Sequence, residues 1–236
     1  MSATTLHTLR VFLGPRGEGG NPLGVILDGA AVAPARRQAV AADLGFSETV
    51  FVDDRTTGAL RIHTPTVELP LAGHPLVGTA WLLAHAGTPV ATLRPPAGEV
   101  ATWSGGELTW IRGRPEWGPP YDKPQLESVA AVDAFSLPGG DAMLAPWTWE
   151  DEPAGRLRAR VFPNGIGIAE DEATGAAALQ FGALLGRDLV IRQGVGSELH
   201  VRPAADGTVA VGGRVAAVSR RTYDGPAPAS GAGTPK

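Results

Sequence analysis

Hydrophobic residues in the first half of the chain recur in short alternating or β-branched runs. These runs predict strands at residues 5–13, 23–27, 49–52, 60–63, 99–103 and 107–112, with a further short strand around residue 92. The glycine- and proline-rich stretch 14–22 predicts a turn between the first two strands. Residues 33–44 have helical character, and Gly45 is well placed to end that helix.

A different pattern covers residues 76–86, where only two polar residues interrupt an otherwise apolar run. A helix that is apolar all round belongs inside a domain. Pro75 suits its first position, and Gly87 suits the left-handed residue that follows a helix. The pattern predicts a buried helix with Gly73 and His74 at its amino end, where free N–H groups favour an anion.

The second half of the chain repeats this plan in a looser form. A predicted strand at 158–162 precedes the segment 163–186, which ends in another apolar helix closed by Gly186. Gly186 lies 99 residues after Gly87, and this shift also superposes the strands that precede the two helices. We therefore expect two similar halves, each with a sheet around one buried helix.

Turn residues mark the boundary between the halves. The stretch 113–124, GRPEWGPPYDKP, is dense in glycine and proline and is interpreted as a linker. We predict an N-terminal domain at 1–114 and a C-terminal domain at 115–223. Residues 224–236, DGPAPASGAGTPK, have the composition of a disordered tail.

Composition narrows the class of function. Of the 236 residues, 43% are apolar and 19% charged, and no run approaches the roughly 18 apolar residues that span a membrane. The net charge of −4 and the lack of a lysine or arginine cluster argue against nucleic acid or anionic membranes as partners. The first residues lack the pattern of a signal peptide, so we expect a cytoplasmic protein.

The residues that commonly bind metals are sparse. The chain has no cysteine, and its five histidines form no HxH or HxxxH pair. This excludes disulfides and thiolate nucleophiles within the chain, and a metal site is not expected.

Three ionisable residues lie where local structure directs them toward one cleft. His74 begins the first buried helix, Asp171 precedes the second, and Glu48 opens a predicted strand. Each has a structural alternative, because His74 could pack beside a turn, Asp171 could stabilise a helix start and Glu48 could be exposed. A helix amino end favours neutral imidazole. A carboxyl against Phe46 and Phe51 has a raised pKa and can both take and give a proton.

Five motifs resemble those of the phenazine-biosynthesis PhzF-like family, in the family's order and across both halves. They are GGNPLGV (19–25), FSETVFV (46–52), RIHTPTVELPLAGHPLVGTAWLL (61–83), GIAEDEATGAAA (167–178) and IRQG (191–194). The stretch TPTVELPLAGHP followed by GTAW is a specific signature. By contrast, GNP and RQG are weak by themselves.

The resemblance implies a diaminopimelate-epimerase-like fold. This is an α/β (α+β) arrangement of two similar halves, each a curled mixed β-sheet wrapped around a central buried helix. The active site of such proteins lies in the cleft between the halves, where both helix amino ends point. The resemblance also implies a homodimer.

The resemblance further implies roles for particular residues. In the family's phenazine enzymes the glutamate of the SET motif shuttles a proton on a cyclic dienyl amino acid, without cofactor or metal. By position this glutamate is Glu48, and the residues that hold the substrate are His74 and Asp171. The substrate-binding positions are Ser47, Gly73, Gly175 and Ala176. Related epimerases that use a thiol from each half are not a match, because this chain has no cysteine.

One position departs from the family pattern. The family's substrate-binding turn usually reads ATGSA, whereas residues 173–177 here read ATGAA, with Ala176 in the place of serine. A lost hydrogen bond to a charged group is worth roughly 1.5–3 kcal/mol. The substrate therefore lacks the carboxylate that the serine would bind, presents it differently, or is held by backbone groups alone.

Three tryptophans lie in the second half, at Trp117, Trp147 and Trp149. Trp147 and Trp149 are two residues apart and would share one face of a strand. For these two we expect packing rather than a wall of the cleft.

These observations predict a cofactor-independent isomerase that moves a proton within a small unsaturated or cyclic amino acid or related acid, in the biosynthesis of a secondary metabolite. Two alternatives stay open. One is an epimerase or racemase that uses Glu48 and Asp171 as two bases. The other is a homologue that binds a small molecule without catalysis, which the alanine at 176 would suit.

Overall fold

The structure is a computed structural model that describes residues 3–137 and 139–226 of the 236-residue chain. The strands of the first half are β1 (Thr4–Leu13), β2 (Gly19–Ile26), β3 (Glu48–Asp54), β4 (Ala59–His63), β5 (Glu68–Leu69), β6 (Thr92–Leu93), β7 (Val100–Gly105) and β8 (Leu108–Gly113). Those of the second half are β9 (Met143–Leu144), β10 (Trp147–Asp151), β11 (Arg156–Ala159), β12 (Phe162–Pro163), β13 (Leu189–Gln193), β14 (Ser197–Pro203) and β15 (Val209–Tyr223).

Four α-helices and three short 3-10 turns complete the described part of the chain. The α-helices are α1 (Pro34–Leu44), α2 (Gly73–His85), α3 (Val129–Asp133) and α4 (Gly175–Leu185). The 3-10 turns are η1 (Gly29–Ala31), η2 (Pro115–Trp117) and η3 (Asn164–Ile166). None of these described helices is long and apolar enough to cross a membrane.

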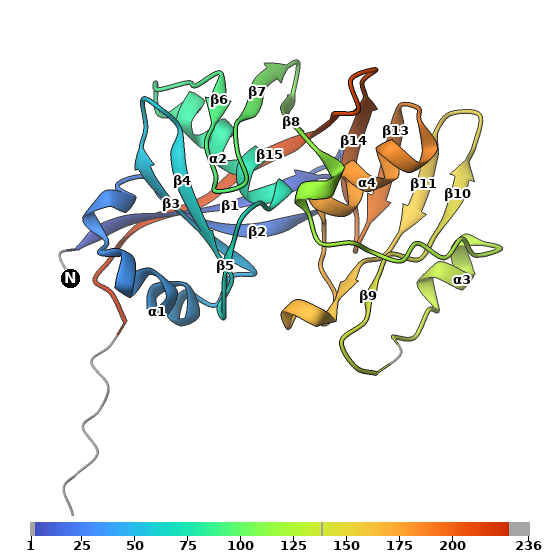
Figure 1. Cartoon of the computed structure of the whole chain (residues 1–236), viewed down its shortest axis with the longest axis horizontal. Helices are drawn as coiled ribbons and strands as arrows, with labels where there is room; N and C mark the ends of the chain where they lie inside the picture. The colour runs from blue at the N-terminus through green and yellow to red at the C-terminus, as the bar shows by residue number, and fades with distance from the viewer. Residues whose placement is uncertain (1–2, 138, 227–236) are drawn as a thin grey trace, which may run out of the picture.

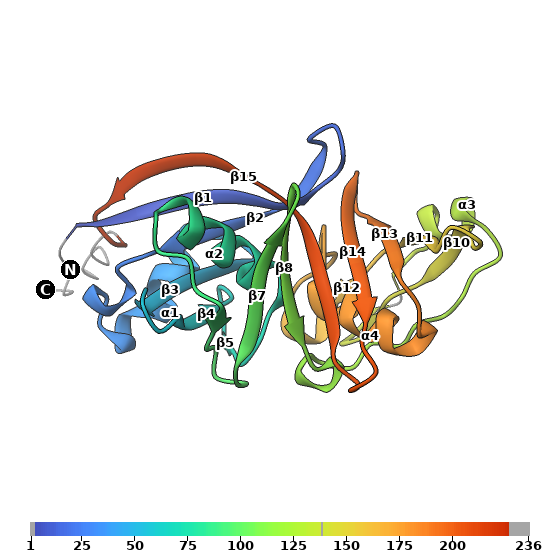
Figure 2. The same cartoon turned by 90° about the horizontal axis from the view of Figure 1, so that it is seen from above.

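Most strands belong to one 13-stranded sheet. Its main path runs β10-β11-β13-β14-β15-β1-β2-β3-β4-β5, and β8, β7 and β6 branch from β15. The pair β9–β12 is separate. The sheet curls into two halves, one around α2 and one around α4, as Figures 1 and 2 show. This is the mixed α/β architecture that the sequence predicted.

The last strand joins the two halves. Residues 209–212 of β15 pair with β14, 209–213 pair with β8, and 214–223 pair with β1. Strand pairing thus crosses the predicted boundary between residues 1–114 and 115–223. The division into two domains stays a prediction. Of the predicted tail, residues 227–236 lie outside the described part of the chain.

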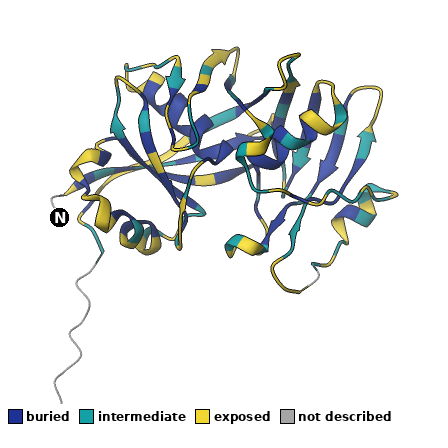
Figure 3. Cartoon of the chain, in the orientation of Figure 1, coloured by how far each residue is buried: buried dark blue, intermediate teal, exposed yellow. Residues whose placement is uncertain are grey.

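Both central helices are buried, as their apolar patterns predicted (Figure 3). Each contains a glycine where a strand residue packs against the helix. A Cβ at Gly78 of α2 would lie 2.5 Å from a methyl of Leu23. A Cβ at Gly182 of α4 would lie 2.6 Å from a methyl of Val209. The helices therefore approach the sheet more closely than a larger residue would permit.

Two element predictions need correction. The expected strand 158–162 is broken, because β11 ends at Ala159 and pairs with β13, whereas Phe162 belongs to β12 and pairs with β9. The chain changes partner between these strands, and its apolar residues do not reveal the change. Helix α2 begins at Gly73, two residues before Pro75, the predicted first position.

Candidate active site

The two central helices meet at their amino ends. A Cβ on Gly73 would lie 2.5 Å from the Cα of Gly175, and a Cβ on Gly175 would lie 2.6 Å from the Cα of Gly73. Only glycine fits at both positions, since the atoms that would be struck are backbone. The residues that precede the helices, Ala72 and Thr174, make no side-chain cap. The helix starts therefore present N–H groups that no capping side chain occupies, at the junction of the halves.

Glu48, His74 and Asp171 converge on this junction. Their exposed fractions are 5%, 2% and 7%. Glu48 is the first residue of β3, His74 the second residue of α2, and Asp171 lies in the turn before α4. The Oε2 atom of Glu48 lies 3.3 Å from Nε2 of His74. The two atoms are close, but their geometry does not form a hydrogen bond. Neither atom has another hydrogen-bond partner among the described residues. Two buried polar atoms are thus free to bind something else.

Asn21 joins Asp171 and His74, and the sequence analysis did not single it out. Its side-chain amide donates to Oδ1 of Asp171 at 2.7 Å and to the Ala173 carbonyl at 3.0 Å. The same nitrogen lies 3.3 Å from Nδ1 of His74. The two N–H groups of this amide are already directed to Asp171 and Ala173, so the contact with His74 does not fix which ring nitrogen carries the proton. The GNP motif holds this asparagine. By itself this short motif is a weak signal, because glycine and proline mostly mark turns.

Hydrogen bonds fix the turn that carries Asp171. Thr174 Oγ1 donates to Oδ2 of Asp171 at 2.6 Å. Gln193, the buried glutamine of the RQG motif, donates to the Asp171 carbonyl at 2.8 Å and accepts from the Thr174 N–H at 3.2 Å. Both carboxylate oxygens of Asp171 therefore have protein donors, whereas Oε2 of Glu48 has none in the described structure.

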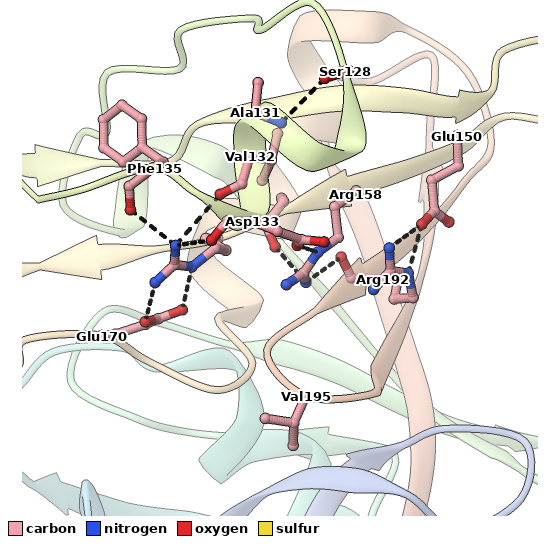
Figure 4. Close-up of polar contacts among 12 residues, drawn as sticks. Ser128, Ala131, Val132, Asp133, Phe135, Glu150, Arg158, Glu170, Arg192 and Val195 are labelled. Carbon is pink, nitrogen blue, oxygen red and sulfur yellow. Dashed lines mark hydrogen bonds and ion pairs between the residues drawn. The ribbon is translucent and has the colours of Figure 1, made fainter.

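The acidic neighbours of Asp171 serve as anchors. Glu170 accepts two hydrogen bonds from Arg160, which also donates to carbonyls at the end of α3 (Figure 4). Glu172 accepts from Oγ of Ser197 at 2.7 Å and from the Val195 N–H. Glu170 and Glu172 thus anchor the turn to neighbouring segments, and neither lies in the first turn of α4. Asp171, between them, faces the junction.

Burial shifts the pKa of each central group. Desolvation raises the pKa of Glu48 to about 8, the charge of Asp171 adds to this, and the Ser47 hydroxyl opposes it. Desolvation also raises the pKa of Asp171 to about 6, against hydrogen bonds from Thr174 and Asn21. The pKa of His74 falls to about 3, chiefly through burial. Near neutral pH, His74 is uncharged and Glu48 is mostly protonated.

These groups form the floor of a cavity of about 320 Å³. This is the small end of the range of about 300–1,000 Å³ usual for ligand sites. Its walls come from both halves and include Gly73, Gly175 and Ala176. Ser47 does not line the cavity but donates to Oδ1 of Asn21 at 3.2 Å. The cavity suits a single-ring ligand lying over both helix starts.

Two of the three tryptophans pack in the core, as the sequence predicted, and the third lies at the cavity. Trp147 and Trp149 pack edge to face on β10, and Trp147 also packs edge to face on Phe181 of α4. Trp117 lines the cavity. Tyr121 lines it too, and burial together with the charges of Asp171 and Glu48 raises the pKa of its phenol. Tyr121 gave no signal in the sequence beyond its place in a linker.

No group of three or more metal-binding side chains occurs among residues 3–137 and 139–226. The cavity instead presents carboxyl, imidazole and backbone N–H groups. Such a set can hold a small acid and move a proton on it.

Comparison with known proteins shows the family of this chain. A family model described as phenazine biosynthesis-like protein (PhzC-PhzF) matches residues 15–109. The trans-2,3-dihydro-3-hydroxyanthranilate isomerase of Pseudomonas aeruginosa is 32% identical in an alignment 206 residues long, and the match covers 67% of this chain and 72% of that protein. The chain belongs to the phenazine biosynthesis-like protein family.

Other comparisons cover less of the relative or show the fold alone. With the enzyme of the same name from Pseudomonas fluorescens, identity is 45% over 64 residues, and the match spans 23% of that protein. A PhzF-family protein from Bacillus anthracis has a TM-score of 0.78 at 19% identity, covering 94% of this chain and 99% of that one. A hydroxyproline epimerase from Agrobacterium vitis has a TM-score of 0.60 at 12% identity, covering 95% and 94%. These likenesses bear out the diaminopimelate-epimerase-like fold.

Proposed function

We propose that this protein is a cofactor-independent isomerase that moves a proton within a small unsaturated or cyclic amino acid or related acid. Glu48 takes a proton from one carbon of the substrate and returns it to another carbon of the conjugated system. His74 and Asp171 hold the substrate. The names of the relatives support an isomerase, and the biosynthesis of a secondary metabolite is the role we propose for it.

The observation that carries this proposal is the state of the Glu48 carboxyl. It is buried at the floor of the cavity, its Oε2 has no hydrogen-bond partner in the described structure, and its pKa is raised to about 8. A general base or acid is most effective when its pKa lies near the working pH. The carboxyl has both the freedom and the proton affinity to exchange a proton with carbon.

A two-base epimerase is the second candidate, because two carboxyl groups with raised pKa face one cavity. The hydrogen bonds favour a single base. Asp171 receives Asn21 on one oxygen and Thr174 on the other, so a proton taken up there would disrupt at least one of these bonds. A non-catalytic ligand-binding homologue is the third candidate.

A product assay distinguishes the three. The first substrate to test is trans-2,3-dihydro-3-hydroxyanthranilate, which the name of the Pseudomonas relatives gives, followed by a panel of cyclic amino acids. Double-bond migration supports the isomerase, inverted configuration supports the epimerase, and binding without turnover supports the third candidate. Glu48→Gln should lower turnover roughly 10²–10⁴-fold. Exposed Glu127→Gln, as the control, should leave turnover unchanged.

A further inference from the structure

Segment 117–123 packs against the start of α4 and supplies part of the cavity wall (Figure 1). A Cβ on Gly118 would lie 2.8 Å from the Cβ of Ala176, so the backbone of the segment touches the helix at this point. Glycine at 118 permits this close approach. The approach brings Tyr121, three residues further along the segment, to the cavity.

Gln180 of α4 holds this segment in place. Its side-chain nitrogen donates to the Pro119 carbonyl at 2.8 Å, and its Oε1 accepts from Nζ of Lys123 at 2.7 Å and from the Tyr121 N–H at 3.4 Å. The indole nitrogen of Trp147 donates to the Lys123 carbonyl at 3.2 Å. The stretch that the sequence predicted to be a linker is thus bound to the second half on both sides of Tyr121. These bonds fix the backbone that carries the phenol ring.

Within the described residues, two side-chain hydroxyls line the cavity, those of Thr174 and Tyr121. The Thr174 hydroxyl is fully engaged, because it donates to Oδ2 of Asp171 at 2.6 Å and accepts from Nε2 of Gln193 at 3.0 Å. Tyr121 is 7% exposed, and its hydrogen bonds to residues 3–137 and 139–226 are made by its backbone alone. A buried hydroxyl is normally hydrogen-bonded. The Tyr121 hydroxyl is therefore free to bind a ligand, and the proton transfer by Glu48 does not use it.

The surroundings of the phenol restrict what it can bind. The charges of Asp171 and Glu48 act on the phenol and raise its pKa, so it stays neutral and can both donate and accept. An anionic substituent beside these carboxyls would be repelled, and an ammonium group would pair with a carboxylate directly. An uncharged hydroxyl gains most from the phenol, because each hydroxyl can donate to the other.

We propose that Tyr121 is a specificity-determining residue, and that its phenol hydroxyl binds a hydroxyl substituent of the ligand in this cavity. The inference rests on the proposed isomerase function only in that the ligand is a substrate, and its test measures binding alone. Among small unsaturated or cyclic acids, it selects those that carry a hydroxyl group.

The test compares benzoate with 3-hydroxybenzoate and 4-hydroxybenzoate, each of which differs from benzoate by one hydroxyl. Calorimetry on the full chain at one pH and salt concentration gives the three dissociation constants. We expect at least one hydroxybenzoate to bind roughly 2- to 10-fold more tightly than benzoate, which is the contribution of one neutral hydrogen bond. Tyr121→Phe removes the phenol hydroxyl and should abolish this preference.

The second tyrosine of the sequence provides a matched control. Tyr223 donates its hydroxyl to Oδ2 of Asp43 at 2.6 Å and does not line the cavity. Tyr223→Phe removes the same atom and should keep the preference. The proposal is overturned if the natural chain shows no preference, or if the preference persists in Tyr121→Phe. Failure of all three acids to bind at millimolar concentration would overturn it as well.

A spectroscopic measurement separates direct contact from a change in packing. Because Tyr121 and Tyr223 are the two tyrosines of the sequence, labelling tyrosine with carbon-13 at the ring carbon that bears the hydroxyl gives two NMR signals. The preferred hydroxybenzoate should shift the Tyr121 signal more than benzoate does and leave the Tyr223 signal unchanged. Equal shifts of the Tyr121 signal with the two acids would contradict a hydrogen bond between the hydroxyls.

Comparison with the turnover of Glu48→Gln separates this inference from the proposed function. If the preference depends on Tyr121 while Glu48→Gln turns over normally, the isomerase mechanism is wrong and the role of Tyr121 stands. If Tyr121→Phe binds all three acids as the natural chain does while Glu48→Gln is inactive, the role of Tyr121 is wrong and the mechanism stands.

Discussion

At the scale of single residues, Glu48 illustrates how burial prepares a side chain for chemistry at a cost in stability. Its carboxyl is 5% exposed, and desolvation raises its pKa from 4.5 to about 8. A group whose pKa is raised on folding stabilises the fold fully below its unfolded pKa. That contribution is lost as the pH rises through the folded pKa. The folded protein should therefore lose the contribution of Glu48 between about pH 4.5 and pH 8.

This loss gives a stability prediction for Glu48→Gln. The amide cannot ionise, so the variant should gain stability relative to the natural chain as the pH rises from 5 to 8.5, by on the order of a few kcal/mol. Thermal unfolding at a series of pH values measures the difference. Glu127→Gln, at an exposed position, should show no such trend. A difference between Glu48→Gln and the natural chain that does not change with pH would mean that Glu48 titrates normally.

The residues of the site could be predicted from the sequence to different degrees. Glu48, His74 and Asp171 lie in extended motifs, and the structure places all three at one cavity. Asn21 and Gln193 lie in motifs of three or four residues, and their roles depend on contacts across 150 and 22 positions of the chain. Such long-range contacts leave no local pattern. Tyr121 is missed for the same reason.

At the scale of elements, the site depends on the contact between the starts of α2 and α4. A Cβ on Gly175 would meet the backbone of Gly73 at 2.6 Å, and backbone cannot move aside as a flexible side chain can. The helix starts, and with them His74 and Ala176, would have to separate. A change at this contact should therefore affect both the stability of the fold and the positions of the residues at the site.

Gly175→Ala should lower the free energy of unfolding by about 1–3 kcal/mol, the usual cost of overpacking. It should also weaken binding of benzoate, because the N–H groups of the two helices would no longer converge. Thermal unfolding and calorimetry measure the two effects. The control is Gly139→Ala, where a Cβ would meet nothing within 4 Å. Equal unfolding free energy and equal binding in the two variants would show that stability and binding do not depend on the contact between the helix starts.

The helices were easier to predict than the strands around them. Apolar runs that end at a glycine predicted both central helices, because a helix surrounded by protein has apolar residues on every face. The strand expected at 158–162 divides between two sheets, and alternation of residues carries no information about pairing partners.

At the scale of the whole molecule, β15 holds the halves together. Its first residues pair with β14 of the second half and with β8 of the first, and its later residues pair with β1 of the first half. The cleft is therefore bounded by a shared sheet rather than by a flexible linker. The similar plan of the two halves was visible in the sequence as a shift of 99 residues between Gly87 and Gly186. The shared last strand was not, because its residues resemble those of any strand.

Family resemblance also predicts a homodimer. Light scattering at micromolar concentration should give twice the chain mass of 24.3 kDa. A monomer at every concentration tested would contradict the prediction.

The central claim is that Glu48 transfers a proton to and from carbon, and solvent exchange tests it most directly. In this mechanism the Glu48 carboxyl exchanges its proton with solvent between turnovers. In heavy water, deuterium should therefore enter the product or recovered substrate at carbon, as mass spectrometry or NMR of the tested cyclic and unsaturated acids would show. Glu48→Gln should abolish the label while remaining folded, as thermal unfolding would show. Labelling at carbon that persists in Glu48→Gln would contradict the account.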